Sequence, residues 1–150
     1  MYPMHRCSLL HVEDDDAAAF LFRLALDEVG FTGSVYRVTN GEDALLFLRK
    51  REAYQNARTP RLVVLDLNIP TQDGWSVLAD RNSDPVLRQI PFVILSTAPA
   101  IKNEQQAITS GAIAYLEKGR NFEAVVKQAG IIARLVESSE NSYATSSAAV

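Results

Sequence analysis

The chain has 150 residues, of which 47% are hydrophobic and 22% are charged, as is typical of one globular domain. Its 15 basic residues are outnumbered by 18 acidic ones, and the net charge of −3 argues against a general nucleic-acid-binding protein. The single cysteine, Cys7, cannot form an intramolecular disulfide, and no apolar run approaches the roughly 20 residues of a membrane span. We therefore expect a cytoplasmic protein that contacts neither membrane nor nucleic acid.

Short apolar segments alternate along the chain with longer segments of helical periodicity. The segments predicted as strands are 8–12, 34–38, 62–65, 92–95 and 112–116. The segments predicted as helices follow them in turn, at 17–29, 41–51, 75–81, 102–110 and 121–138. The third strand is continuously apolar, as expected of a strand covered on both faces of a parallel sheet. This alternation predicts a three-layer α/β fold with a five-stranded parallel sheet.

The predicted elements form one domain, at residues 8–137, with no internal repeat. Residues 1–7 are expected to be an N-terminal extension, and residues 138–150, rich in serine and alanine, a flexible tail. This tail is too short to hold an output domain. Within the acidic run at 13–16, Asp16 is the expected N-cap of the first helix.

Polar side chains follow four of the predicted strands. Glu13 and Asp14 follow the first strand, Asp66 the third, Ser96 the fourth and Lys118 the fifth. In an open parallel sheet, ligands bind at the carboxyl ends of the strands, which lie at one edge. We therefore expect these side chains to form one site, although each of them alone has an ordinary explanation as a helix cap, a turn residue or a solvated charge.

The residue types at this edge favour phosphoryl chemistry. Carboxylates that lie close together repel one another unless a cation neutralises them. Because the site offers oxygen ligands without histidine or cysteine, Mg²⁺ is the expected cation, with Mn²⁺ as its substitute. Lys118 and Ser96 would then bind the oxygens of a phosphoryl group. Asp66, at the end of the central strand, is the expected nucleophile, because an aspartate can form an acyl phosphate.

Four motifs make the chain resemble the receiver domains of two-component response regulators. They are Leu10-His11-Val12-Glu13-Asp14-Asp15, Val63-Val64-Leu65-Asp66-Leu67-Asn68-Ile69-Pro70 with Asp73-Gly74, Val93-Ile94-Leu95-Ser96-Thr97, and Ala114-Tyr115-Leu116-Glu117-Lys118. The resemblance covers about residues 8–137. It implies a doubly wound, flavodoxin-like (βα)5 fold with strand order 2-1-3-4-5.

The resemblance also assigns a role to each residue of the metal site. Glu13 and Asp14 are the acids on the metal side, and Asp66 is both a metal ligand and the phosphoacceptor. The backbone carbonyl of Asn68 is a further metal ligand. Asp15 borders the site without belonging to it.

The remaining roles concern the response to phosphorylation. By the resemblance, Lys118 pairs with the phosphate, Ser96 is the switch hydroxyl and Tyr115 is the aromatic residue that moves with it. The chain departs from the family at Gly119, where a proline usually follows the lysine. Since glycine permits other conformations, the sequence does not define the geometry of this loop.

The family implies a histidine kinase as the phosphoryl donor, with no enzymatic activity beyond phosphotransfer and autodephosphorylation. The segments 52–57, 84–87 and 118–122 are similar to those of single-domain receivers that partner phytochrome histidine kinases. We therefore expect a single-domain response regulator of a phosphorelay, possessing a switchable surface for protein interactions.

Two alternative functions use similar residues. A haloacid-dehalogenase-type phosphatase also uses aspartate with Mg²⁺, but its nucleophile follows the first strand in an Asp-x-Asp motif. Here Asp66 follows the third strand, and Asn68 stands where the second acid would be. A degenerate receiver that acts only as a protein-binding scaffold is disfavoured because all the reactive residues are present together.

Two helices are expected to carry interaction surfaces. The first helix has two apolar stripes, one with Phe20, Leu21 and Leu24, the other with Phe22, Leu26 and Val29. One stripe should pack in the core and the other should dock the kinase, and we expect Phe22 and Leu26 to belong to the docking stripe. On the last helix, Phe122 is predicted to face the sheet, whereas Ile131 and Leu135 fall on the opposite side. A homodimer through this helix and the last strand is the expected use of that patch.

Overall fold

The computed structural model describes the backbone of residues 8–148 and the side chains of residues 8–139. The expected extension at residues 1–7, with Cys7, lies outside this range. The described chain forms one parallel sheet of five strands: β1 (Leu9–Val12), β2 (Val35–Val38), β3 (Leu62–Leu65), β4 (Phe92–Ser96) and β5 (Ala114–Glu117). The strand order is β2-β1-β3-β4-β5, which confirms the predicted topology.

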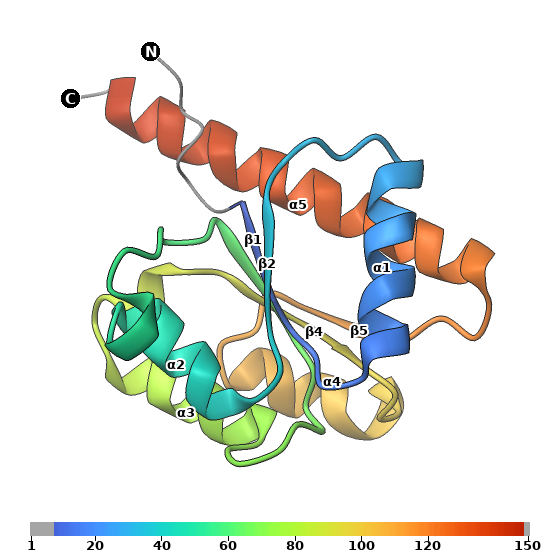
Figure 1. Cartoon of the computed structure of the whole chain (residues 1–150), viewed down its shortest axis with the longest axis horizontal. Helices are drawn as coiled ribbons and strands as arrows, with labels where there is room; N and C mark the ends of the chain where they lie inside the picture. The colour runs from blue at the N-terminus through green and yellow to red at the C-terminus, as the bar shows by residue number, and fades with distance from the viewer. Residues whose placement is uncertain (1–7, 149–150) are drawn as a thin grey trace.

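Five α-helices cover the two faces of this sheet, as Figure 1 shows. They are α1 (Asp16–Glu28), α2 (Gly41–Arg49), α3 (Gly74–Ser83), α4 (Ala100–Thr109) and α5 (Phe122–Ala148). Helices α1 and α5 pack on one face, whereas α2, α3 and α4 lie on the other (Figure 1). The predicted three-layer α/β fold is therefore confirmed. Two short 3-10 helices, Glu52–Tyr54 and Leu87–Gln89, lie in the connections before β3 and β4.

The central strand β3 explains why the sheet needs both helical layers. Val63 and Leu65 belong to the core under α2, α3 and α4, whereas Leu62 and Val64 belong to the core under α1 and α5. All four side chains are fully buried. The uninterrupted apolar run of this strand thus reflects burial on both faces, as expected for a parallel sheet.

Three local predictions need correction. The N-cap of α1 is Asp15 rather than Asp16, because the Asp15 side chain accepts a hydrogen bond from the Ala17 N–H at 3.0 Å. Phe22 and Leu26 are buried in the core under α1, so they do not form a docking stripe. The last helix continues to Ala148, beyond the predicted end at residue 138. The division into an extension, a domain and a flexible tail stays a prediction.

Candidate functional site

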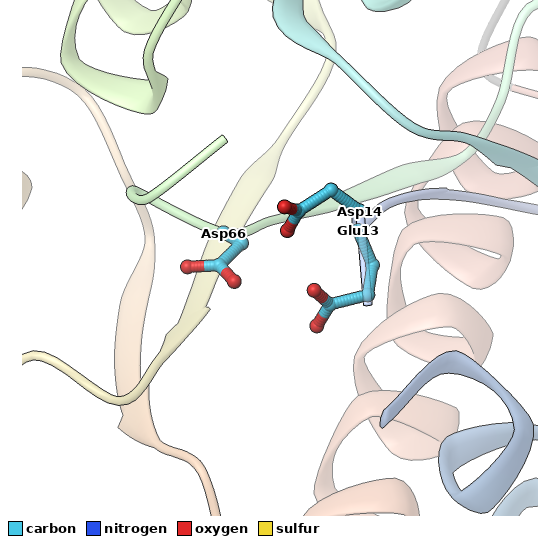
Figure 2. Close-up of side chains that lie close together, drawn as sticks. All are labelled: Glu13, Asp14 and Asp66. Atoms are coloured by element: carbon cyan, nitrogen blue, oxygen red, sulfur yellow. The ribbon is translucent and has the colours of Figure 1, made fainter. Parts of the chain in front are cut away.

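Three carboxylates meet at the carboxyl edge of the sheet. Glu13 and Asp14 follow β1, and Asp66 follows β3, the strand paired with it. One oxygen from each carboxylate lies within 4.8 Å of the others, and Figure 2 shows the three side chains converging on one space. Glu13 and Asp66 are buried, whereas Asp14 is exposed. The acidic cluster predicted from the strand ends is therefore present.

Lys118 is the basic partner of this cluster. Its Nζ atom lies 2.8 Å from Asp66 Oδ2 and 2.5 Å from Glu13 Oε1. Partial burial alone would lower the pKa of Lys118, but the hydrogen bonds and charges of Asp66 and Glu13 outweigh burial and raise it. The lysine is therefore held as an ammonium beside the expected nucleophile, where it can bind an anionic oxygen.

Glu13 has the least accessible of the three carboxylates. Burial raises the pKa of Glu13, and the ammonium of Lys118 offsets only part of this effect. The backbone carbonyl of Glu13 accepts a hydrogen bond at 2.9 Å from the Nε atom of Arg37, which lies on β2. Two cationic side chains thus hold this loop, one at its carboxylate and one at its backbone.

The donor set fits a hard divalent cation. It consists of the carboxylate oxygens of Glu13, Asp14 and Asp66. The negative charge of Asp66 repels that of Glu13, and a divalent cation bound between the carboxylates would neutralise this repulsion. Asn68 contributes to the site through its backbone N–H, which donates to Asp66 Oδ1 at 3.1 Å. Its expected role as a metal ligand through the backbone carbonyl stays a prediction.

Ser96 and Tyr115 lie on the other side of Asp66. Ser96 is fully buried at the end of β4, and its Oγ atom accepts a hydrogen bond from the Ala98 N–H at 3.3 Å. The Tyr115 ring is also buried, and its hydroxyl donates to the Ala98 carbonyl at 2.7 Å. Burial first, and then the charges of Glu117 and Asp66, raise the pKa of Tyr115. Both side chains therefore hold the same segment of the β4–α4 loop.

Gln128 is a site residue that the sequence reasoning missed. Its Oε1 atom accepts a hydrogen bond at 3.0 Å from the Gly119 N–H, and its Nε2 atom donates to the Glu117 carbonyl. The amide thus bridges the residues on both sides of Lys118. Because a proline has no N–H, the residue usual in the family could not donate this hydrogen bond. No local motif around position 128 indicates the contact, which depends on how α5 packs.

His11 is a packed core residue. Its ring is buried beside Phe22, with centroids 4.6 Å apart. Burial, followed by the charges of Lys118 and Arg37, lowers the pKa of His11 to about 3. The histidine is therefore neutral and takes no part in the acidic cluster.

The fold and the cluster define a phosphoacceptor domain, and comparison with known families agrees. Residues 9–129 match the response regulator receiver domain. The chain belongs to this family, whose members are signalling domains that partner histidine kinases. The match spans all five strands of the sheet and all residues of the cluster. A dehalogenase-type phosphatase is accordingly not favoured.

Two relatives show how much of the chain is similar to known proteins. Response regulator Rcp1 of Synechocystis sp. is 34% identical over 122 residues, covering 79% of this chain and 81% of Rcp1. A probable methanogenesis regulatory protein, FilR2 of Methanothrix harundinacea, is 36% identical over 115 residues, covering 77% of this chain and 74% of FilR2. The similarity therefore extends over most of the length of both relatives.

Solved structures of response regulators are also similar to this chain. The phosphorylated cyanobacterial phytochrome response regulator RcpA has a TM-score of 0.78 at 33% identity, covering 85% of this chain and 91% of RcpA. The Mn²⁺-bound form of Rcp1 has a TM-score of 0.76 at 31% identity, covering 83% of this chain and 90% of Rcp1. These findings confirm a role in two-component phosphorelay signalling and a resemblance to phytochrome response regulators. Among the described helices, none is long and apolar enough to cross a membrane.

Proposed function

We propose that Asp66 accepts a phosphoryl group from the phosphohistidine of a histidine kinase, with Mg²⁺ held by Glu13, Asp14 and Asp66. The observation that carries this proposal is the convergence of the three carboxylates within 4.8 Å, with Lys118 bonded directly to Asp66. The Mn²⁺-bound form of the similar Rcp1 supports a divalent cation in such a receiver. When bound, the cation neutralises the acids and part of the phosphoryl charge.

The reaction is a displacement at phosphorus. A carboxylate oxygen of Asp66 attacks, the bond from phosphorus to the imidazole nitrogen of the donor breaks, and an acyl phosphate forms. Lys118 moves from the carboxylate pair to the new phosphoryl oxygens, because these carry more negative charge. Asn68 holds Asp66 through the hydrogen bond to Oδ1. The chain thus supplies the nucleophile, its orientation and the compensating charge.

Ser96 and Tyr115 are proposed to transmit the phosphorylation state. The Ser96 hydroxyl leaves the Ala98 N–H for a phosphoryl oxygen, and the β4–α4 loop shifts with it. The Tyr115 hydroxyl donates a hydrogen bond to the carbonyl of the same Ala98, so it follows the loop. The surface of α4 and β5 then changes with the chemistry at Asp66.

Labelling with radioactive acetyl phosphate tests the assignment of the nucleophile. Asp66→Asn keeps the size of the side chain and removes the nucleophilic carboxylate, so labelling should be abolished. The matched control is Asp27→Asn, which makes the same change at an exposed position of α1 and should leave labelling unchanged. EDTA should abolish labelling of the wild type, and added Mg²⁺ should restore it. Undiminished labelling of Asp66→Asn with Mg²⁺ present would contradict the proposal.

The proposed kinase-docking surface is the exposed stripe of α1, beside the acidic loop. Phe20 is 63% exposed, and Leu21 and Leu24 are also exposed, whereas apolar residues of this size are usually buried. A phytochrome-type histidine kinase is the proposed donor. Phe20→Ser with Leu24→Ser should reduce phosphotransfer from such a kinase and preserve labelling by acetyl phosphate. Loss of both activities would indicate damaged folding instead.

The proposed homodimer uses α5 and the neighbouring end of β5. Ile131 and Leu135 are half-buried, and Leu135 packs against the core, so the expected patch is smaller than predicted. Phe122, predicted to face the sheet, is exposed, as is Ile113 just before β5. A dimer should therefore depend on Ile113 and Phe122. Sedimentation of the wild type and of Ile113→Glu/Phe122→Glu, each with and without beryllofluoride, tests it, and a monomeric wild type in both states would exclude the dimer.

A further inference from the structure

A basic groove lies at the opposite end of the sheet from the acidic cluster. It has a volume of about 820 Å³ and is open to solvent. Its walls come from the end of α2, from residues 58–61 before β3 and from residues 84–91 before β4. Figure 1 shows the segment after α2, in green, at the end of the sheet away from the start of α1. The chemistry proposed for Asp66 does not use this groove.

The groove concentrates positive charge in an acidic protein. One third of the 15 basic residues of the chain line it: Arg49, Lys50, Arg51, Arg58 and Arg61. Among the described lining residues, Asp84 is acidic, and its Oδ2 atom lies 3.7 Å from Arg49 Nε. Within the described residues, no carboxylate forms an ion pair with Lys50, Arg51 or Arg58. Lys50, Arg51 and Arg58 therefore give the described part of the groove a net positive charge.

Helix geometry explains only part of this concentration. Arg49 lies in the last turn of α2 and Lys50 is its C-cap, where cations interact favourably with the helix dipole. Arg58 and Arg61 follow in an irregular segment outside α2, so the preference for cations in the last turn of a helix does not explain their presence. They gather beside the end of α2 because the chain returns there to begin β3.

The floor of the groove is apolar and its wall is fixed. Leu48, Leu87 and Ile90 are buried beneath the cations, and Val86 on the rim is 71% exposed. The guanidinium of Arg81 donates to the Ile90 carbonyl at 2.9 and 3.0 Å, which holds the segment before β4 in place. The groove is therefore a preformed combination of apolar floor and cationic rim.

We propose that this groove binds an acidic segment of a partner protein, in which carboxylates alternate with apolar side chains. The cations pair with carboxylates, for which arginine offers bidentate geometry, and the apolar residues contact Val86 and the floor. A volume of about 820 Å³ suits a short stretch of peptide rather than a single anionic group. Among the residues whose side chains the structure describes, none that lines the groove is aromatic, and stacking on aromatic rings is what single-stranded nucleic acid uses.

Fluorescence anisotropy tests the proposal with the full chain. The probe is a fluorescein-labelled peptide of alternating glutamate and leucine, and the control peptide replaces glutamate with lysine. Arg51→Glu/Arg58→Glu should weaken binding of the acidic peptide about tenfold or more. The matched control, Lys102→Glu/Lys127→Glu, makes the same charge change at exposed positions of α4 and α5 and should bind like the wild type.

Two further measurements separate the groove from a general charge effect. Val86→Ser should weaken binding of the glutamate-leucine peptide while leaving binding of polyglutamate unchanged. Labelling of Arg51→Glu/Arg58→Glu by acetyl phosphate should equal that of the wild type, which shows that the variant is folded. Equal affinity of both double variants for the acidic peptide would overturn the proposal, as would tighter binding of single-stranded RNA than of the peptide.

Discussion

The loop that carries Lys118 allows a quantitative test at Gly119. A Cβ atom added there would lie 2.7 Å from Ala124 Cβ and 2.9 Å from the backbone of Ala124 and Val125. Contacts this short force the loop or the start of α5 to move, and helix backbone moves less readily than a side chain. Overpacking of this kind costs about 1–3 kcal/mol, so Gly119→Ala should lower the free energy of unfolding by that amount.

Gly119→Pro should be more destabilising than Gly119→Ala. Besides adding the same Cβ atom, proline removes the N–H that donates to Gln128 Oε1 at 3.0 Å. Leaving a partly buried acceptor unpaired costs about 1–3 kcal/mol more. The difference between the two variants therefore contains the lost hydrogen bond together with the constraints of the proline ring on φ and on Lys118. It also shows why the residue usual in the family does not suit this chain.

Urea unfolding followed by circular dichroism provides the measurement. The control is Gly130→Ala on α5, where the added Cβ would meet no atom closer than 3.8 Å. Since alanine favours a helix interior over glycine by about 1 kcal/mol, this variant should be as stable as the wild type or more stable. If Gly119→Ala unfolded within about 0.5 kcal/mol of the wild type, the packing argument would be wrong.

Three further predictions concern the core and the charges of the site. Phe22→Ala should lower the free energy of unfolding by about 3–5 kcal/mol, whereas Phe20→Ala on the exposed stripe should change it by about 0.5 kcal/mol or less; urea unfolding measures both. Because the pKa of His11 is about 3 in the folded chain and 6.5 in its ordinary state, its stabilising contribution is present above pH 6.5 and lost as the pH falls towards 3. Unfolding free energy should therefore fall by up to about 1.4 kcal/mol per pH unit in that window, and His11→Asn should show a shallower slope in urea titrations at several pH values. Lys118→Met leaves Glu13 and Asp66 without their ammonium, so added Mg²⁺ should raise the melting temperature more in this variant than in the wild type; an equal rise by calorimetry would argue against the lysine's neutralising role.

Helix α1 shows what the spacing of apolar residues can and cannot predict. The spacing of apolar residues identified two stripes on this helix; Phe22 and Leu26 of the second stripe share a buried face, whereas Val29, predicted with them, is exposed at the C-cap. Which stripe faces the core depends on the rotation of the helix about its axis, and the packing of α1 against α5 and the sheet sets that rotation. Phe22 and Leu26 consequently lie in the core, and Phe20 and Leu24 face solvent.

The sequence by itself determined the sheet and the carboxylates at its edge. Apolar runs of four or five residues that end in a charged or hydroxyl group locate the strand ends, and the parallel topology then brings Glu13, Asp66 and Lys118 together. These inferences need only local patterns and one rule of topology. They hold because the chemistry lies within a residue or two of each strand.

Only the tertiary structure decided the contacts between distant segments. The bridge from Gln128 to Gly119 exists because α5 returns over the end of β5, and the basic groove exists because α2, the segment before β3 and the α3–β4 connection end at the same place. No local pattern marks such meetings, since each depends on the relative positions of elements rather than on the residues beside them. Packing of the two apolar cores fixes those positions, and with them the surroundings of Lys118 and the charge at the far end of the sheet.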